Sequence, residues 1–251
     1  MSDAVLRTRG LHKRFGGIAA THDVSISLER GARHALIGPN GAGKTTLVNL
    51  LTGMLEPTSG TILLDEVDIT RLPAHQRARR GLVRTFQINQ LFDTLTPLET
   101  LALVIAQRKG AGFRLFAPLS RHHDFAEEGA SLLQRMHLGD VMDKRVGVLA
   151  YGKRRLLEIA IALASRPRVL LLDEPMAGVP SSDSTDILET LAALPPDVTV
   201  LLIEHDMDLV FRFARRISVL VNGALLAEGP ADAIARDPQV KAVYLGEGDH
   251  G

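Results

Sequence analysis

A glycine-rich loop, a lysine and two threonines stand together at residues 38 to 46. The apolar run Ala35–Ile37 before the loop predicts a buried strand, and leucines with helical spacing follow the loop, at Leu47, Leu50 and Leu51. The loop has the phosphate-binding spacing G-x-x-x-x-G-K-[ST], in the strand–loop–helix context that this motif requires. A glycine-rich turn before an ordinary helix is the alternative, and the complete spacing in this context disfavours it.

The residue types of this loop suit an anion and its metal ion. Gly38, Gly41 and Gly43 permit positive φ and close approach, so that successive backbone N–H groups can converge on a phosphate. A helix N-terminus near Gly43 adds its positive dipole. Lys44 supplies a mobile charge for the β- and γ-phosphates, and the Thr45 hydroxyl is suited to bind Mg²⁺. We therefore predict a nucleoside triphosphate site formed by Gly38, Pro39, Asn40, Gly41, Ala42, Gly43, Lys44, Thr45 and Thr46.

An acidic pair and a histidine follow two later apolar runs. Asp173 and Glu174 end the run that starts at Arg168, and His205 follows the run Val198–Ile203. Such runs are typical of parallel strands buried on both faces, whose carboxyl ends meet at one edge of the sheet. Asp173 then suits a second contact to Mg²⁺, direct or through water, and Glu174 suits a base that deprotonates the attacking water. The alternative for this acidic pair is a solvated strand end. We predict that His205 contacts the γ-phosphate, and a structural histidine is the alternative.

The composition argues against several other classes of site and partner. The 251 residues carry 29 Lys+Arg and 29 Asp+Glu, a balance that gives no support to a nucleic-acid partner. We therefore interpret Arg77, Arg79, Arg80 and Arg84 as a solvated helix face. Without cysteine the chain has no disulfide and no thiolate metal site. The start of the sequence lacks a signal-peptide pattern and no apolar run is of membrane-spanning length, so we expect a soluble or peripheral protein.

The order of the apolar patterns predicts an α/β core with a helical insertion. Strand-like runs occur at 4–9, 22–28, 61–64, 168–173, 198–203, 217–221 and 225–228. A helix at Ser182–Leu194 is expected to connect two strands of the core as a crossover. Between residues 97 and 164 the apolar residues change to helical spacing, in three segments. We therefore predict a single domain in which 1–96 and 165–251 form a nucleotide-binding α/β core and 97–164 form an inserted α-helical subdomain.

Five motifs occur in the order and spacing of an ABC transporter ATPase subunit. They are the phosphate loop, Arg84–Gln87, Leu149–Lys153, Leu172–Pro175 and Glu204–His205. The chain resembles this family over essentially its whole length. It is most similar to the ATPases of branched-chain amino-acid importers, in Leu-Ala-Tyr-Gly at 149–152 and in the ending 237–247. The resemblance implies a phosphate-loop NTPase core of the ABC ATPase type, with a mostly parallel sheet, an antiparallel N-terminal β-subdomain, and hydrolysis of ATP with Mg²⁺.

The resemblance also assigns roles that the residues alone do not predict. Phe15 stands where the family places the aromatic ring that stacks on adenine, and a core phenylalanine is the alternative. Gln87 matches the glutamine that reaches Mg²⁺ and the attacking water. The signature loop, which caps the ATP of the opposite subunit, is matched by Ala150, Tyr151, Gly152 and Lys153. The expected catalytic residues are Lys44, Gln87, Glu174 and His205. The expected metal-binding residues are Thr45, Gln87 and Asp173.

Two positions depart from the family pattern. Ala150 replaces the usual serine of the signature loop, and Pro180 stands where an aspartate is usual. Both lie in parts that this chain lends to its partner, whereas the residues for its own ATP match the pattern. We therefore expect a second ABC ATPase subunit as partner, in a heterodimer, with a homodimer as the alternative.

The resemblance implies a place in a larger transport assembly. Closure of an ATPase dimer around ATP would drive transmembrane permease subunits that receive cargo from an extracytoplasmic substrate-binding protein. We expect the chain to lie peripherally at the cytoplasmic face of the inner or plasma membrane, without a nucleic-acid partner. Import of branched-chain or other hydrophobic amino acids is the favoured function. ATPases for urea or short-amide import, or for lipopolysaccharide export, are the alternatives.

Overall fold

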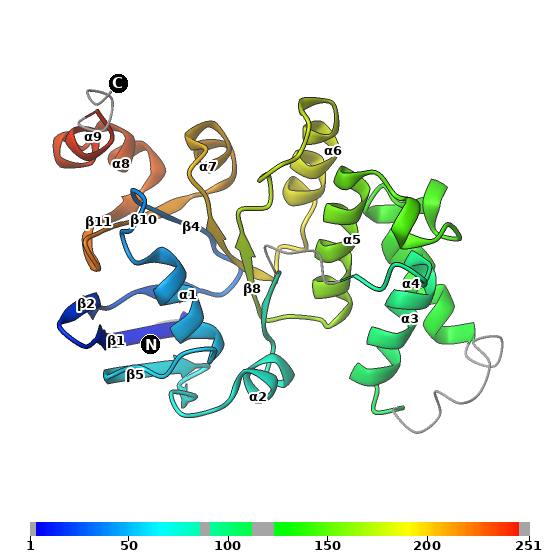
Figure 1. The fold of residues 1–251 in the computed structure, drawn as a ribbon, viewed down its shortest axis with the longest axis horizontal. Helices are drawn as coiled ribbons and strands as arrows, with labels where there is room; N and C mark the ends of the chain where they lie inside the picture. The colour runs from blue at the N-terminus through cyan, green and yellow to red at the C-terminus, as the bar shows by residue number, and fades with distance from the viewer. Residues whose placement is uncertain (1–3, 86–90, 112–122, 246–251) are drawn as a thin grey trace. The chain divides into compact units, whose positions relative to one another are not determined.

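The computed structural model describes residues 4–85, 91–111 and 123–245 (Figure 1). The predicted site residue Gln87 lies outside these residues. The chain groups into two compact units. The first comprises Met1–Arg84, Arg168–Glu174 and Pro195–Gly251, and the second comprises Thr85–Pro167 and Pro175–Leu194. The predicted domain boundaries at 97 and 164 stay a prediction.

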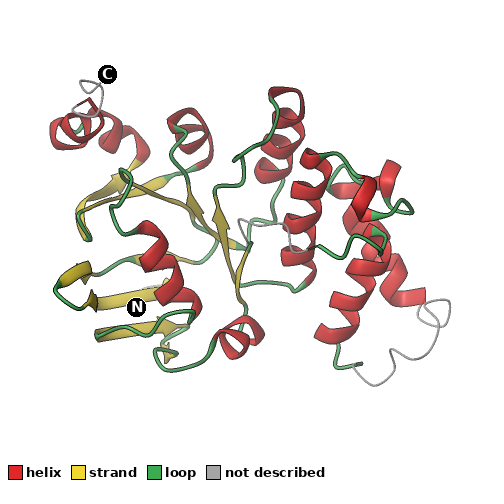
Figure 2. Ribbon diagram, in the orientation of Figure 1, coloured by secondary structure: helices red, strands yellow, loops and turns green. Residues whose placement is uncertain are grey.

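In the described part of the chain, the first unit contains a six-stranded sheet with the strand order β11-β10-β4-β9-β8-β7. Figure 2 draws the strands in yellow. Its strands are β4 (Arg33–Ile37), β7 (Leu82–Arg84), β8 (Val169–Asp173), β9 (Thr199–Ile203), β10 (Arg216–Val221) and β11 (Ala224–Pro230). Neighbouring strands are parallel except β10 with β11. Every residue of β8 and β9 is buried, as their continuous apolar sequences predict.

A second sheet of the same unit is antiparallel and built mostly from the N-terminal residues. Its strands are β1 (Ala4–Phe15), β2 (Ile18–Val24), β3 (Ser27–Glu29), β5 (Ser59–Leu64) and β6 (Val67–Asp68). The predicted strand at 22–28 is thus two strands, and Asp23, near the break, has a positive φ of 52°. Helix α1 (Lys44–Thr52) shares one hydrophobic cluster with residues of both sheets, such as Leu6 and Leu36. The mostly parallel sheet and the antiparallel N-terminal sheet are confirmed.

The arginine-rich segment is not a uniform solvated face. Arg77, in α2 (Ala74–Arg79), is 1% exposed. Its guanidinium donates to the carbonyl oxygens of Leu50 and Leu51 at 2.6 and 2.7 Å, which satisfies groups that the end of α1 leaves without helical partners. Arg84 lies in β7 with its side chain 11% exposed. The predicted solvated face is therefore wrong for Arg77 and Arg84, although Arg79 and Arg80 are exposed.

Helices make up most of the described second unit. They are α3 (Pro97–Arg108), α4 (His123–Arg135), α5 (Tyr151–Ala164) and α6 (Ser181–Ala192), with short 3₁₀ turns at Gly139–Val141 and Val146–Val148. A capping box starts α3, because the Thr96 hydroxyl accepts from the backbone of Glu99 and the Glu99 carboxylate accepts from the backbone of Thr96. Helix α6, expected in the core, is grouped with these helices.

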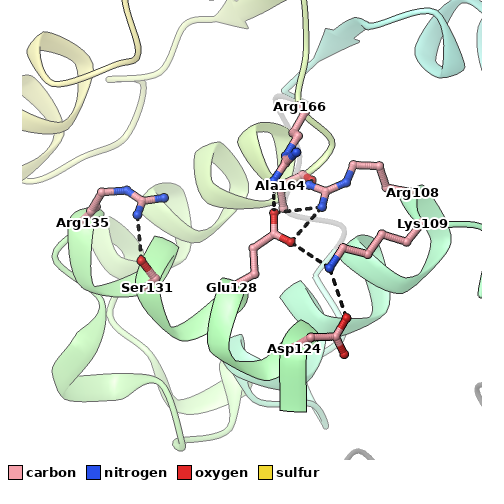
Figure 3. Close-up of polar contacts among 8 residues, drawn as sticks. All are labelled: Arg108, Lys109, Asp124, Glu128, Ser131, Arg135, Ala164 and Arg166. Carbon is pink, nitrogen blue, oxygen red and sulfur yellow. Dashed lines mark hydrogen bonds and ion pairs between the residues drawn. The ribbon is translucent and has the colours of Figure 1, made fainter. Parts of the chain in front are cut away.

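Glu128 of α4 holds three helices of this unit together (Figure 3). Its carboxylate accepts from Arg108, at the end of α3, at 2.8 and 2.9 Å, and from Arg166, just beyond α5, at 2.9 Å. Arg108 also donates to the carbonyl oxygen of Ala164, the last residue of α5, at 2.7 Å. Burial alone would raise the pKa of Glu128, but Arg108, Lys109 and Arg166 lower it to about 2.

Three short helices complete the first unit: α7 (Met207–Phe213), α8 (Ala231–Arg236) and α9 (Pro238–Leu245). Of the helices formed by the described residues, none is long and apolar enough to cross a membrane.

Candidate active site

The phosphate loop has the backbone geometry that its glycines predict. Gly38, Gly41 and Gly43 have φ of 153°, 77° and 99°. A Cβ at Gly38 would lie 2.1 Å from the carbonyl oxygen of Leu220, and one at Gly43 would lie 2.4 Å from that of Ala20. These two positions therefore need glycine for the close approach of neighbouring backbone as well as for the positive φ.

Helix α1 presents its N-terminus at the end of this loop. The helix begins at Lys44, Gly43 is its N-cap without a side-chain hydrogen bond, and no acidic residue stands in its first turn. The first N–H groups of a helix have no intrahelical acceptor, and the dipole there favours an anion. The ammonium of Lys44 donates to the carbonyl oxygens of Gly38 and Pro39, at 2.5 and 2.9 Å, so it lies over the loop.

An open pocket of about 460 Å³ adjoins the loop, entirely within the first unit. It is lined by residues 40–46 of the loop and α1, by Ile18–Ala20 of β2, by Glu174, and by Asn222 and Gly223. Phe15 is not among the lining residues. It ends β1 with 49% of its surface exposed, so it is not a core phenylalanine. The ammonium of Lys13 lies 5.1 Å from the centre of the Phe15 ring. The stacking of Phe15 on adenine stays a prediction.

The predicted acidic pair and His205 meet at one edge of the parallel sheet. Strands β8 and β9 pair in parallel, and the N–H of Glu174 donates to the carbonyl oxygen of Ile203 at 2.9 Å. Glu174 has a positive φ of 45°, uncommon for a residue with a side chain. Its Oε1 lies 3.8 Å from Nδ1 of His205, whose side chain is 68% exposed. The structure therefore brings together Glu174, the phosphate loop and His205, as predicted.

Glu204 belongs to a motif that the sequence shows, but its residue type alone predicted no role; it is 1% exposed and next to His205. Its Oε2 accepts from the backbone N–H of His205 at 3.0 Å and lies 3.7 Å from the imidazole Nδ1. Glu204 therefore fixes the backbone that carries His205. A charged residue that directly follows a buried strand was the signal available in the sequence.

Asp173 is buried at the end of β8, with a side chain 3% exposed. It forms an ion pair with Arg84, whose Nη1 donates to Oδ1 of Asn49 at 2.7 Å. Carboxylate and hydroxyl oxygens, as on Asp173 and Thr45, are the ligands that Mg²⁺ prefers beside phosphate oxygens and water. Among the described residues, no three His, Asp or Glu side chains cluster to hold a metal ion. This donor set fits a metal ion that arrives with phosphates.

The predicted signature loop begins α5. Ala150 is the N-cap and makes no side-chain hydrogen bond, and Gly152 is buried in the first turn. The hydroxyl of Tyr151 donates to the carbonyl oxygen of Ala177 at 2.9 Å. A Cβ added at Gly178 would lie 3.2 Å from this hydroxyl. Lys153 donates to the carbonyl oxygen of His137 at 2.6 Å. Within this unit, the signature loop therefore contacts the segment that leads to Pro180.

This fold and pocket define an α/β phosphate-loop nucleoside triphosphatase. A model of the ABC transporter family matches residues 21–177, and one described as branched-chain amino acid ATP-binding cassette transporter matches residues 224–250. The chain is 42% identical to the high-affinity branched-chain amino acid transport ATP-binding protein BraF of Pseudomonas aeruginosa, over 98% of this chain and 100% of the relative. It is 41% identical to LivG of Escherichia coli over the same shares. The chain belongs to the ABC transporter family, as an ATP-binding cassette.

Solved structures agree with this assignment. The ADP conformation of MJ1267, an ATP-binding cassette of an ABC transporter, matches with a TM-score of 0.82 and 32% identity, covering 97% of this chain and 99% of that one. A nucleotide-free cassette from an ABC transporter matches with a TM-score of 0.81 and 32% identity, covering 96% and 98%. The predicted family and fold class are confirmed, and the chain is an ABC ATPase.

Proposed function

We propose that this chain binds and hydrolyses ATP to power the import of branched-chain or other hydrophobic amino acids. The observation that carries the proposal is the open pocket lined by Lys44, Thr45 and Glu174 in one compact unit. The choice of cargo is supported by the branched-chain amino acid transport ATP-binding proteins that match the chain over 98% of its length.

In the proposed mechanism, the loop N–H groups and the ammonium of Lys44 bind the β- and γ-phosphates. Thr45, Asp173 and Gln87 would hold Mg²⁺, which when bound neutralises phosphate charge. Glu174 accepts the proton of the attacking water, and the neighbouring His205 contacts the γ-phosphate. Phe15 stacks on the adenine ring, a contact worth about 1–3 kcal/mol by analogy with base stacking.

Closure of a dimer links this site to transport. The loop Ala150–Lys153 closes over the ATP of a second ATPase subunit, and each closed site excludes bulk water. ATP binds the closed state better than the open state, and this difference in affinity drives the movement. Transmembrane permease subunits carry the cargo from an extracytoplasmic substrate-binding protein, and this chain lies peripherally at the cytoplasmic face.

Two substitutions separate ATP binding from hydrolysis. Glu174→Gln should lower turnover by at least about 100-fold, because an amide keeps the size of the side chain but cannot accept the proton. The same variant should retain ATP in a stable dimer, measured by size-exclusion chromatography with labelled ATP. Lys44→Ala should lose ATP binding, because it removes the charge that faces the phosphates.

An exposed glutamate on α4 supplies the matched control, and Glu127→Gln should leave turnover unchanged. Rapid phosphate release by Glu174→Gln would contradict the role of Glu174. The cargo is identified separately, by purifying the membrane complex with its binding protein and determining the bound ligand by mass spectrometry. A ligand other than a hydrophobic amino acid would contradict the proposed substrate class but not the ATPase mechanism.

A further inference from the structure

Arg84 and Asp173 form a largely buried ion pair next to helix α1. Strands β7 and β8 are parallel neighbours, with Arg84 in register with Leu171. The side chains of Arg84 and Asp173 are 11% and 3% exposed, and a guanidinium nitrogen of Arg84 binds Oδ2 of Asp173. The carboxylate that the mechanism assigns to Mg²⁺ therefore already contacts a permanent cation of the chain itself.

The same guanidinium reaches the helix that carries Thr45. Its Nη1 donates to Oδ1 of Asn49 at 2.7 Å. Thr45 and Asn49 are four residues apart on α1, so they lie on one face of the helix. Arg84 is planar, always charged and able to make two directed bonds at once. It therefore ties the end of β8 to the face of α1 on which Thr45 stands.

We propose that Arg84 is a positioning residue and the resident counter-ion of Asp173, so that Asp173 holds a divalent metal ion only together with nucleotide phosphates. This inference rests on the proposed function of the site. A metal ion alone would meet the positive charge of Arg84 at the carboxylate, and the repulsion is weakly screened because both side chains are buried. A complex of a metal ion with a triphosphate has a net negative charge, and this charge offsets the positive charge of Arg84.

The test uses Mn²⁺ as the metal probe, in the full chain, with bound Mn²⁺ followed by electron paramagnetic resonance. In the absence of nucleotide, the unmodified chain should bind Mn²⁺ weakly, and ATP should tighten binding strongly. Arg84→Gln removes the charge and should tighten the binding of Mn²⁺ alone by about fivefold or more. Arg84→Lys keeps the charge and should resemble the unmodified chain in this assay. Arg84→Met supplies a second uncharged variant of similar length.

The controls separate this role from a purely structural one. A structural role alone would lower the melting temperature in Arg84→Gln without tightening Mn²⁺ binding. The double variant Arg84→Gln with Asp173→Asn should lose the gain, because the gain requires the carboxylate. Unchanged or weaker Mn²⁺ binding in the uncharged variants would overturn the proposal, as would equally tight Mn²⁺ binding to the unmodified chain with and without ATP. Failure of the unmodified chain to bind ATP would instead count against the proposed function.

Discussion

His34 is a residue of the first unit whose ionisation depends on the fold. It lies in β4 with 1% of its surface exposed, and its Nε2 lies 2.8 Å from Oγ of Ser218. The Ser218 hydroxyl donates to Glu228 at 2.9 Å, so the serine oxygen accepts from Nε2–H. Nδ1 of His34 is buried and has no hydrogen-bond partner in the described part of the chain. A proton on Nδ1 would therefore be a buried, unpaired charge.

This burial predicts a loss of stability in mild acid. Burial lowers the pKa of His34 to about 4, with Glu228 opposing the shift and Arg216 adding to it. The unfolded chain binds a proton below its ordinary pKa near 6.5, whereas the folded chain does not until the pH reaches about 4. The contribution of His34 to the free energy of unfolding is therefore full above pH 6.5. It falls, by about 3 kcal/mol in all, as the pH decreases to 4.

Urea unfolding at pH 7, 5.5 and 4 measures this effect, with His34→Gln as the control. The glutamine variant should lose most of the pH dependence in this window, whatever its stability at pH 7. If the free energy of unfolding fell equally with pH in the two proteins, other groups would be the cause of the acid sensitivity.

At the scale of single residues, the sequence predicted the groups that belong to a local pattern. Lys44 and Thr45 follow from loop spacing, and Glu174 follows from its place after a buried strand. Phe15 could be assigned only through the resemblance. Arg77 and Arg84 were misread, because the burial of these charged side chains depends on distant partners, and Glu204 was given no role. The guanidinium of Arg77 binds carbonyl oxygens 26 and 27 residues away in the chain, which no local pattern reveals.

At the scale of elements, the cluster around Glu128 joins α3, α4 and the end of α5 (Figure 3). Glu128→Gln should destabilise this unit by about 1 kcal/mol, because partly exposed ion pairs contribute little individually and Arg108 keeps its bond to Ala164. Thermal unfolding in low and high salt measures the loss, which should shrink at high salt because the pairs are screened.

Glu127→Gln, an exposed change one residue away on α4, is the matched control. A loss in Glu128→Gln that does not depend on salt would assign its role to packing rather than to charge. Because the pKa of Glu128 is lowered to about 2, its contribution to stability is present above its ordinary pKa near 4.5 and fades as the pH falls towards 2. This window lies mostly below that of His34.

The elements that the sequence predicted well are those with long apolar patterns. Strands β8 and β9 are continuous apolar runs, and helices α3 and α5 have enough apolar residues to define a helical period. Strands β6 and β7, of two and three residues, are too short for a period and were missed. Helix α6 was recognised, but its grouping with the helices of the second unit depends on contacts that sequence spacing does not encode.

At the scale of the whole molecule, the departures at Ala150 and Pro180 bear on how two subunits work together. Ala150 and Pro180 are the N-caps of α5 and α6, and neither supplies a side-chain hydrogen bond. Serine and aspartate are favoured N-caps, so both helices lack a common stabilising contact at ends that the mechanism presents to a partner. The heterodimer hypothesis therefore stays a prediction with a structural argument behind it.

The double variant Ala150→Ser with Pro180→Asp tests this hypothesis. The unmodified chain alone should hydrolyse ATP slowly and without cooperativity, and the double variant should be about tenfold faster, because a hydroxyl donor to a charged oxygen contributes about 1.5–3 kcal/mol. Phosphate release measured against protein concentration and ATP concentration checks both statements. Full, cooperative turnover by the unmodified chain as a homodimer would contradict the hypothesis.

The whole-molecule features were the least predictable from one chain. Equal numbers of acidic and basic residues gave no information about a protein partner. Cargo specificity, in the proposed function, depends on membrane and binding-protein subunits, so no residue of this chain encodes it. The expected partners and cargo therefore come from the family resemblance and from the relatives, and not from the physical patterns of the sequence.

The hydrogen bond from Tyr151 to Ala177 has an evolutionary consequence. Its acceptor is a backbone carbonyl oxygen, which is present whatever residue occupies position 177. Mutations can therefore change the side chains at 177, 179 and 180 without removing the contact. Gly178 is different, because it combines a φ of 72° with a Cβ position 3.2 Å from the Tyr151 hydroxyl. We expect Tyr151 and Gly178 to be conserved together among relatives, while the residues around Gly178 vary.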